Sequence, residues 1–127
     1  MKTLLIMLLM IGVDARTKEN LSGVAQELAI PTLVAYHTCS TPFVVIDGLR
    51  TPQEQQQHVD NGVSWTLNSK HLTGHAIDFV PKTFDWNDVD AFEDVYECIS
   101  SYSSNLIWGG NWKQRDYGHI ELIYTKR

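Results

Sequence analysis

The chain has 127 residues, of which 43% are apolar and 20% are charged, so it can fold as one globular domain with its own core and is not expected to be disordered. It carries 10 basic and 15 acidic residues, a net charge of −5, and no cluster of Lys or Arg that would neutralise phosphates. These numbers argue against nucleic acid as a partner and leave no room for a second binding module, and we expect a monomer.

The N-terminal segment is apolar. One positive charge at Lys2 precedes the apolar run 3–13, and Asp14 and Ala15 follow as a possible cleavage point. The run resembles a short signal peptide, and it is shorter than the roughly 20 apolar residues of a transmembrane helix. Three interpretations stay open: a cleaved signal, an anchor that tethers the protein and later releases it, or a first element that packs on the domain. Residues 1–15 are therefore treated as an extension that contacts a membrane only through 3–13 if uncleaved, and 16–127 as the domain.

A helical region and a strand are predicted in the first part of the domain. Apolar residues recur at helical spacing over residues 21–37, but Pro31 interrupts the pattern, and proline bars a continuous helix. We expect two short helices or one broken helix there. The run 43–47 is rich in β-branched residues and is bounded by Pro42 and Gly48, which predicts a buried strand.

A helix is then expected from Thr51, because threonine is a favoured N-cap and Pro52 suits the first helical position, and it should end near residues 61–62. A strand over 76–80 follows. A further helix opens at 84–88, and its core stripe has helical spacing: Phe92, Val95, Tyr96, Ile99 and Tyr102.

Short strands at 106–108 and 119–124 complete the pattern. Because helices lie before and between mostly separated strands, the predicted class is α+β, a small and largely antiparallel sheet packed with about three helices.

The two cysteines, Cys39 and Cys98, lie far apart and match no C-x-x-C pattern, which excludes a zinc knuckle. We expect two buried free thiols. Pairing stays an alternative if the protein works outside the cytoplasm, because disulfides persist in oxidising compartments.

Chemistry-bearing side chains gather on the two later strands. Alternation along 76–80 places Asp78 on the face opposite the apolar residues, and the same alternation places His119 and Glu121 together on one face of the last strand. Two adjacent strands would therefore aim Asp78 and His119 at one point. Gly74 allows the sharp turn that brings His71 back toward Asp78.

Two imidazoles and one carboxylate, from His71, Asp78 and His119, form a set that would hold one zinc ion. Three protein ligands leave a coordination position open for water, which is typical of a catalytic rather than a structural site. The histidines without partner spacing are predicted to be unligated helix residues: His37 and His58.

The run 66–78 resembles the S-x-H-x-x-G-x-A-x-D signature of the zinc D,D-carboxypeptidase and L-alanyl-D-glutamate endopeptidase family, which includes many phage endolysins. Its other landmarks follow in the family's order: Gly48-Leu49-Arg50-Thr51, Gln55, Trp108-Gly109-Gly110-Asn111-Trp112 and Asp116-x-x-His119-x-Glu121. The resemblance runs from about residue 16 to 123. It implies a fold of the Hedgehog/DD-peptidase type and hydrolysis of the peptide stems of peptidoglycan.

The resemblance, together with the chemistry of the residues, assigns roles around the metal. Asp116 occupies the position of the family's general base, three residues before His119. Arg50 presents a planar donor fork that would hold the substrate carbonyl and the oxyanion that develops on it. Glu121 suits an outer carboxylate that orients His119, because a fourth zinc ligand would close the open position.

Further residues of the motifs have less defined roles. Ser69 would fix its loop or donate to substrate, and Gln55 matches the family's glutamine. Trp108 and Trp112 would form a wall of the cleft, although simple packing is equally expected for Trp108. His75 matches no family ligand and is predicted to lie in the outer shell or at the surface.

The predicted function is that of a phage-type endolysin, a zinc peptidase that cuts between L-alanine and D-glutamate in the periplasm or cell wall. Synthesis in the host cytoplasm leaves the export route open between the N-terminal segment and another route. Two alternatives remain: a D-alanyl-D-alanine carboxypeptidase, or a non-catalytic zinc domain that binds wall peptide.

Overall fold

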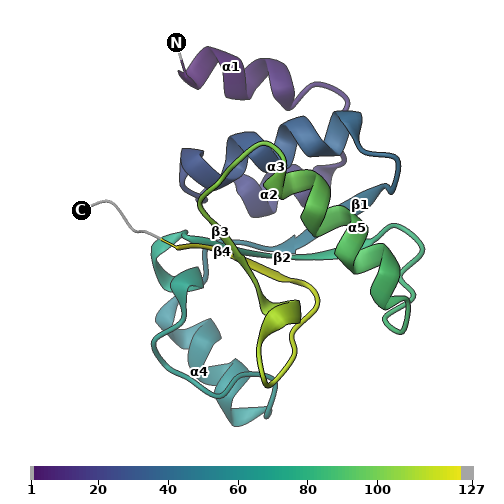
Figure 1. Ribbon diagram of the computed structural model, residues 1–127. Coiled ribbons are helices and arrows are strands. Elements are labelled where there is room, and N and C mark those ends of the chain that lie inside the picture. The colour runs from purple at the N-terminus through teal and green to yellow at the C-terminus, as the bar shows by residue number, and fades with distance from the viewer. Residues whose placement is uncertain (1, 124–127) are drawn as a thin grey trace.

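The protein is represented by a computed structural model that describes residues 2–123, with side chains from residue 4 onward. The elements of this part of the chain, shown in Figure 1, are α1 (Lys2–Leu9), α2 (Ala15–Leu21), α3 (Gln26–Thr38), β1 (Phe43–Asp47), α4 (Pro52–Asp60), η1 (Lys70–Thr73), β2 (Ala76–Pro81), α5 (Val89–Ser100), β3 (Leu106–Trp108), η2 (Gly109–Asn111) and β4 (His119–Leu122).

The strands form one antiparallel sheet in the order β1-β2-β4-β3. The ladder between β2 and β4 sets Asp78 directly opposite His119. The predicted α+β class with a largely antiparallel sheet is confirmed. The described residues contain five α-helices rather than about three, because residues 2–21 form two helices that the pattern did not predict.

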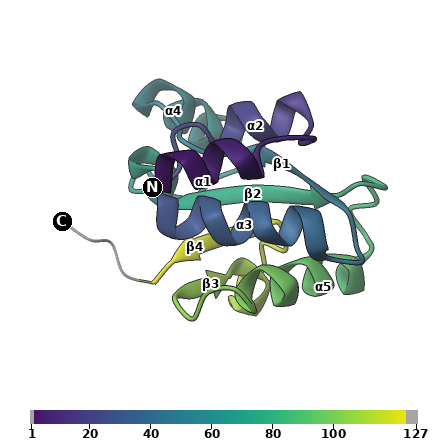
Figure 2. The ribbon, with the colours of Figure 1, turned by 90° about the horizontal axis from the view of Figure 1, so that it is seen from above.

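The core lies between the sheet and the helices on one of its faces. Figures 1 and 2 show α2 and α3 over this face, with α1 outside α3, and α5 packs on β2 and α3. The strand side chains that point into the core are at most 1% exposed: Ile77, Phe79, Ile120 and Leu122. Alternation therefore turns Asp78, His119 and Glu121 to the other face, where Figure 1 shows α4 below the sheet.

Helix α3 corrects one prediction. It runs unbroken from Gln26 to Thr38 with Pro31 inside it, and the break lies earlier, at residues 22–25. An interior proline costs about 3 kcal/mol, through a lost hydrogen bond and the clash of its ring with the carbonyl of the preceding turn. The helix tolerates this cost because Leu28 and Leu33 on either side of the proline are completely buried in the core.

The later helices begin where the sequence predicts. Thr51 caps α4 in a capping box with Glu54, and the helix ends at Asp60. Asp88 caps α5. The predicted core stripe of α5 is confirmed for its buried members, but Tyr102 lies beyond the end of the helix and is 44% exposed.

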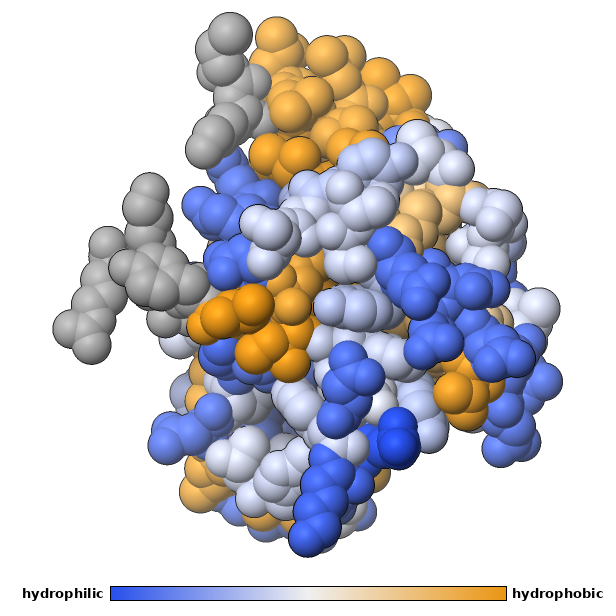
Figure 3. All heavy atoms as spheres, viewed as in Figure 1, coloured by the Kyte–Doolittle hydropathy of each residue, from blue (hydrophilic) through white to orange (hydrophobic). Residues whose placement is uncertain are grey.

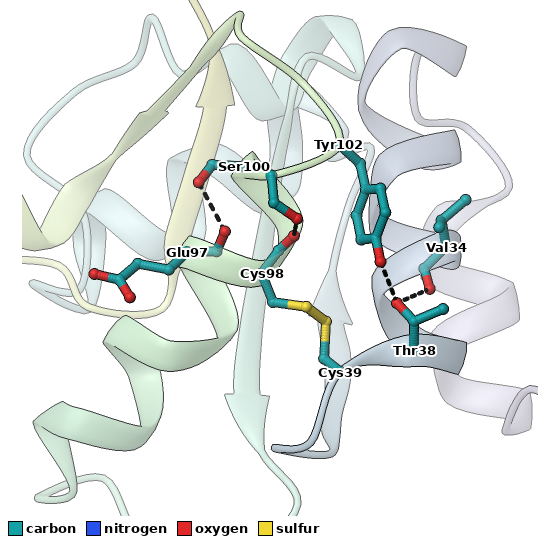
Figure 4. The surroundings of a disulfide bond; sticks show 8 residues. Val34, Thr38, Cys39, Glu97, Cys98, Ser100 and Tyr102 are labelled. Atoms are coloured by element: carbon teal, nitrogen blue, oxygen red, sulfur yellow. Dashed lines mark hydrogen bonds between the residues drawn. A yellow bond between two sulfur atoms is a disulfide. The ribbon is translucent and has the colours of Figure 1, made fainter.

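Cys39 and Cys98 form a disulfide bond, so the prediction of free thiols is wrong. Cys39 follows the end of α3 and Cys98 lies in the last turn of α5, as Figure 4 shows. Because α3 and α5 pack side by side, the two Cα atoms lie 6.1 Å apart, within the usual range for a disulfide. Beside the bond, the hydroxyls of Thr38 and Tyr102 are hydrogen-bonded at 2.7 Å.

The N-terminal segment packs on the domain in this structure. Val13 is 5% exposed within the core, and the carboxylate of Asp14 caps α2 and accepts a hydrogen bond from the hydroxyl of Tyr36. The outer face of this segment is apolar and exposed, and Figure 3 shows it at the top of the molecule: Leu4, Leu5, Met7, Leu8 and Ile11. Within the described residues, none of the helices has the length and apolar character needed to cross a membrane. The division at residue 15 and cleavage there remain predictions.

Candidate metal centre and catalytic cleft

The three predicted ligands come together on the open face of the sheet. His71 lies on η1, Asp78 on β2 and His119 on β4, and their ligand atoms lie within 4.8 Å of one another. Oδ1 of Asp78 is 3.2 Å from Nε2 of His71 and 3.1 Å from Nδ1 of His119. Ligands of a tetrahedral zinc ion, with bonds of about 2.0–2.1 Å, lie roughly 3.3 Å apart. The donor set and its spacing therefore fit zinc.

The turn after η1 places His71. Ser69 caps η1 by accepting a hydrogen bond from the amide of His71. Gly74 ends η1 in the left-handed conformation at φ 74°, and a Cβ at this position would lie 2.3 Å from the carbonyl oxygen of Gly23. Only glycine therefore allows this turn to pack against the helical layer while His71 points to Asp78.

His71 presents its Nε2 to the site. Its Nδ1 donates to the carbonyl oxygen of Gly48 at 2.8 Å, so Nε2 is the ring nitrogen that faces Asp78. Nε2 is buried, and among the described residues it is the one buried side-chain nitrogen or oxygen without a hydrogen-bond partner. A buried nitrogen without a partner is costly, and a metal ion would supply the partner.

His119 is oriented by a carboxylate on its own strand. Its Nε2 donates to Oε1 of Glu121 at 2.9 Å, so Nδ1 faces Asp78. The other oxygen of Glu121 lies 3.0 Å from Nζ of Lys70, which also donates to the carbonyl oxygen of Leu122. Lys70 and His119 therefore occupy both oxygens of Glu121, which suits an outer carboxylate rather than a fourth ligand.

Arg50 is 5% exposed and is held from three sides. Nε and Nη2 donate to Asp47, Nη1 donates to Gln55 at 2.6 Å, and Nη2 also donates to Oδ2 of Asp78 at 3.3 Å. Gln55 is itself buried, and its amide donates to the carbonyl oxygen of Thr66, which fixes the segment after α4. Arg50 therefore orients Asp78, and among the described residues one Nη1 hydrogen is left for a substrate oxygen.

The charges of the cluster are coupled. Burial opposes the ionised form of Asp78, but the two neighbouring imidazoles outweigh it and hold the pKa of this carboxyl far below its usual range. Burial likewise opposes the charged form of His119, yet hydrogen bonds to Asp78 and Glu121 raise its pKa to about 9. The pKa of Glu121 is lowered against its burial by His119 and Lys70.

Asp116 lies beside the three ligands on the segment before β4. Its amide donates to the carbonyl oxygen of Gly109 at 2.9 Å, and a Cβ on Gly109 would meet the carbonyl oxygen of Asp116 at 2.4 Å. The turn that carries Asp116 therefore packs tightly against η2. Burial and the negative charge of Asp78 raise the pKa of Asp116, which makes it a better proton acceptor.

A cleft opens over the ligands, and most of the predicted site residues line it. Of the two predicted wall residues, Trp112 lies in the cleft, with its ring centroid 4.9 Å from that of His119. Trp108 is 4% exposed, stacks on Tyr96 at 5.2 Å and belongs to the core. Its indole donates to the carbonyl oxygen of Tyr117, so it supports the segment that carries Asp116 from behind.

Sequence reasoning missed the side of the cleft that is formed by the end of α4 and the segment after it. Trp65 lines it and packs edge-to-face on Trp112, with ring centroids 6.4 Å apart. His58, predicted to be an unligated helix residue, lies on α4 outside the candidate ligand group and also lines the cleft. The sequence signal that could have identified this side of the cleft is a tryptophan within a largely polar segment. His75 lies outside the metal cluster, with Nδ1 bonded to the hydroxyl of Thr73 at 2.6 Å.

Relatives of this chain include enzymes of phage origin. The chain is 30% identical over 129 residues to the L-alanyl-D-glutamate peptidase of Escherichia phage T5, which covers 84% of this chain and 94% of that protein. It is 32% identical over 85 residues to the L-alanyl-D-glutamate peptidase of Listeria phage A118, or 64% of this chain and 30% of that protein.

Among solved structures, the L-Ala D-Glu endopeptidase ChiX of Serratia marcescens matches with a TM-score of 0.76 and 34% identity, over 85% of this chain and 86% of that one. Residues 9–123 match the family described as phage L-alanyl-D-glutamate peptidase. The match spans the whole sheet, the three clustered ligands and the cleft above them, and the chain belongs to this family.

Proposed function

We propose that this protein is a zinc peptidase that hydrolyses the bond between L-alanine and D-glutamate in the peptide stems of bacterial peptidoglycan. The observation that carries the proposal is the bare Nε2 of His71, buried 3.2 Å from the carboxylate of Asp78 and without a hydrogen bond among the described residues. A metal ion gives that nitrogen a partner, and family membership supports the reaction.

His71, Asp78 and His119 would hold the ion. Bound zinc supplies a Lewis acid for the scissile carbonyl and lowers the pKa of water from 15.7 toward roughly 7. Around it, Glu121 and Arg50 each occupy the outer side of one ligand, so the ring of His119 and the carboxylate of Asp78 keep their donor atoms aimed at one point.

Asp116 acts as the general base. It lies at the edge of the cleft beside the ligands, and burial together with Asp78 raises its pKa toward the pH at which a base works well. It accepts the proton of the attacking water and delivers it to the leaving amine of D-glutamate. Arg50 adds the remaining Nη1 hydrogen to the developing oxyanion.

The test is to incubate the protein with purified sacculi and to identify the products by mass spectrometry. A new D-glutamyl amino terminus is expected. Free D-alanine would instead identify a carboxypeptidase, and binding to sacculi without new termini would identify a wall-binding domain. His71→Ala should abolish cleavage, whereas His75→Ala, a change in the same turn but outside the cluster, should retain it.

The proposed substrate supports a site of action in the periplasm or cell wall. The disulfide between Cys39 and Cys98 supports this, because such bonds persist in oxidising compartments. Export by residues 1–15 or by another route, membrane contact through residues 3–13 and a monomeric state remain predictions.

A further inference from the structure

A second hollow opens beside the catalytic cleft. It is lined by Trp65, Trp112 and Gln114. Trp65 is 57% exposed, and its ring meets that of Trp112 edge-to-face at an interplanar angle of 76°. Tryptophan is enriched at binding surfaces, where its ring offers a large apolar face and its N–H a hydrogen-bond donor.

The hollow is continuous with the metal centre. Trp112 lines both spaces, and its ring lies 4.9 Å from the ring of the ligand His119. Trp65, on the segment after α4, also borders both. A substrate that extends from the metal along this wall therefore passes from the ligand ring onto the two indoles.

The two spaces differ in charge. The catalytic cleft is lined by Arg50, Lys70 and the histidines, together with the carboxylates of the site. The hollow has two aromatic rings and one amide, and among the described residues it has no charged lining. It suits a neutral ligand with an apolar ring face and hydrogen-bonding substituents, whereas the carboxylates of D-glutamate and the residues after it suit the cleft that contains Arg50 and Lys70.

The proposed substrate supplies such a neutral group at the right distance. The amine of its L-alanine is amide-bonded to the lactyl group of N-acetylmuramic acid, so the sugar is uncharged at this point. One residue and one lactyl unit separate the sugar from the scissile bond, a reach of roughly 7 Å. The neutral end of the substrate is therefore the glycan end.

We propose that Trp65, Trp112 and Gln114 form a subsite for the N-acetylmuramyl sugar, in which a ring face of the sugar packs on the indole of Trp65 and the amide of Gln114 contacts its acetamido or hydroxyl groups. This inference rests on the proposed L-alanyl-D-glutamate cleavage. It makes the enzyme prefer stems still attached to glycan over free peptides.

The test compares two substrates that differ only in the sugar: N-acetylmuramyl-L-Ala-γ-D-Glu-L-Lys and N-acetyl-L-Ala-γ-D-Glu-L-Lys. We expect the parent enzyme to have the higher kcat/KM on the muramyl peptide. Trp65→Ala should reduce the ratio of the two kcat/KM values by roughly three- to tenfold, mainly through the KM of the muramyl substrate, and Trp65→Phe should restore part of it.

Trp86→Ala is the matched control. Trp86 is 56% exposed, and it packs near Phe92 instead of lining either space, so its loss should leave the ratio at the parent value. A parent ratio near one, or a Trp65→Ala variant that lowers both activities equally, rejects the sugar subsite while peptide cleavage stands. Hydrolysis of neither substrate by the parent overturns the proposed function and this inference with it.

Discussion

Lys70 and Glu121 form an ion pair at 3.0 Å beside the three candidate metal ligands, and the second oxygen of the same carboxylate accepts a hydrogen bond from His119. Lys70 directly precedes the ligand His71 in the sequence, so one short turn supplies both a ligand and the cation that restrains the outer carboxylate. The pair lies outside the three candidate ligands, and the bond to Glu121 sets Nδ1 as the nitrogen of His119 that faces Asp78.

Glu121→Gln should therefore weaken zinc binding by about 10- to 100-fold, the usual effect of losing an outer carboxylate. Lys70→Met should weaken it less, and Lys70→Arg should restore it, because arginine keeps the charge. Competition with a chromogenic chelator measures the affinity. Glu93→Gln, a change of an exposed carboxylate on α5, is the control, and equal affinity of Glu121→Gln and Glu93→Gln would contradict the role of Glu121.

Asp116→Asn should keep stoichiometric zinc and lose activity by about 10²- to 10⁴-fold, because asparagine cannot accept the proton of the attacking water. Metal content by atomic spectroscopy and the release of D-glutamyl termini from sacculi are measured on the same sample. Cleavage by the variant at the parent rate would reject Asp116 as the base. Loss of zinc along with activity would point to a role in metal binding instead.

Zinc binding should release a proton at neutral pH. His119 has a pKa raised to about 9 in the metal-free protein, so below that pH both of its ring nitrogens carry protons, and Nδ1 must lose one to bind a metal. The apparent affinity should fall about tenfold for each pH unit below this pKa and level off above it. Calorimetry in buffers of different ionisation enthalpy counts the protons, and a count of zero at pH 7 would contradict the raised pKa of His119.

The disulfide should be a major source of stability. It joins residues separated by 59 positions, and closing a loop of this length in the unfolded chain corresponds to about 4 kcal/mol. The double variant Cys39→Ala/Cys98→Ala should lose about this much in denaturant unfolding, and a reducing agent should destabilise the parent but not the variant. Two free thiols in the purified parent after thiol labelling would contradict the bond.

Much of the site is predictable because it depends on short-range patterns. Alternation along β2 and β4 requires Asp78 and His119 to leave the core face, since their apolar neighbours must enter it. The cap at Thr51 and the left-handed turn at Gly74 follow from the same kind of local rule. Such preferences act within a few residues, so the sequence by itself determined the strands, the caps and the clustering of His71, Asp78 and His119.

Other features depend on which distant segments meet, and only the tertiary structure decided them. Pro31 remains inside α3 because the helix is buried, and Cys39 reaches Cys98 because α3 packs against α5. Packing also separates the two tryptophans that flank the glycine pair. Trp108 lies in the core, and Trp112 lies in the cleft beside Trp65. Burial and contact are properties of the whole packed chain, and no local pattern contains the distances on which they depend.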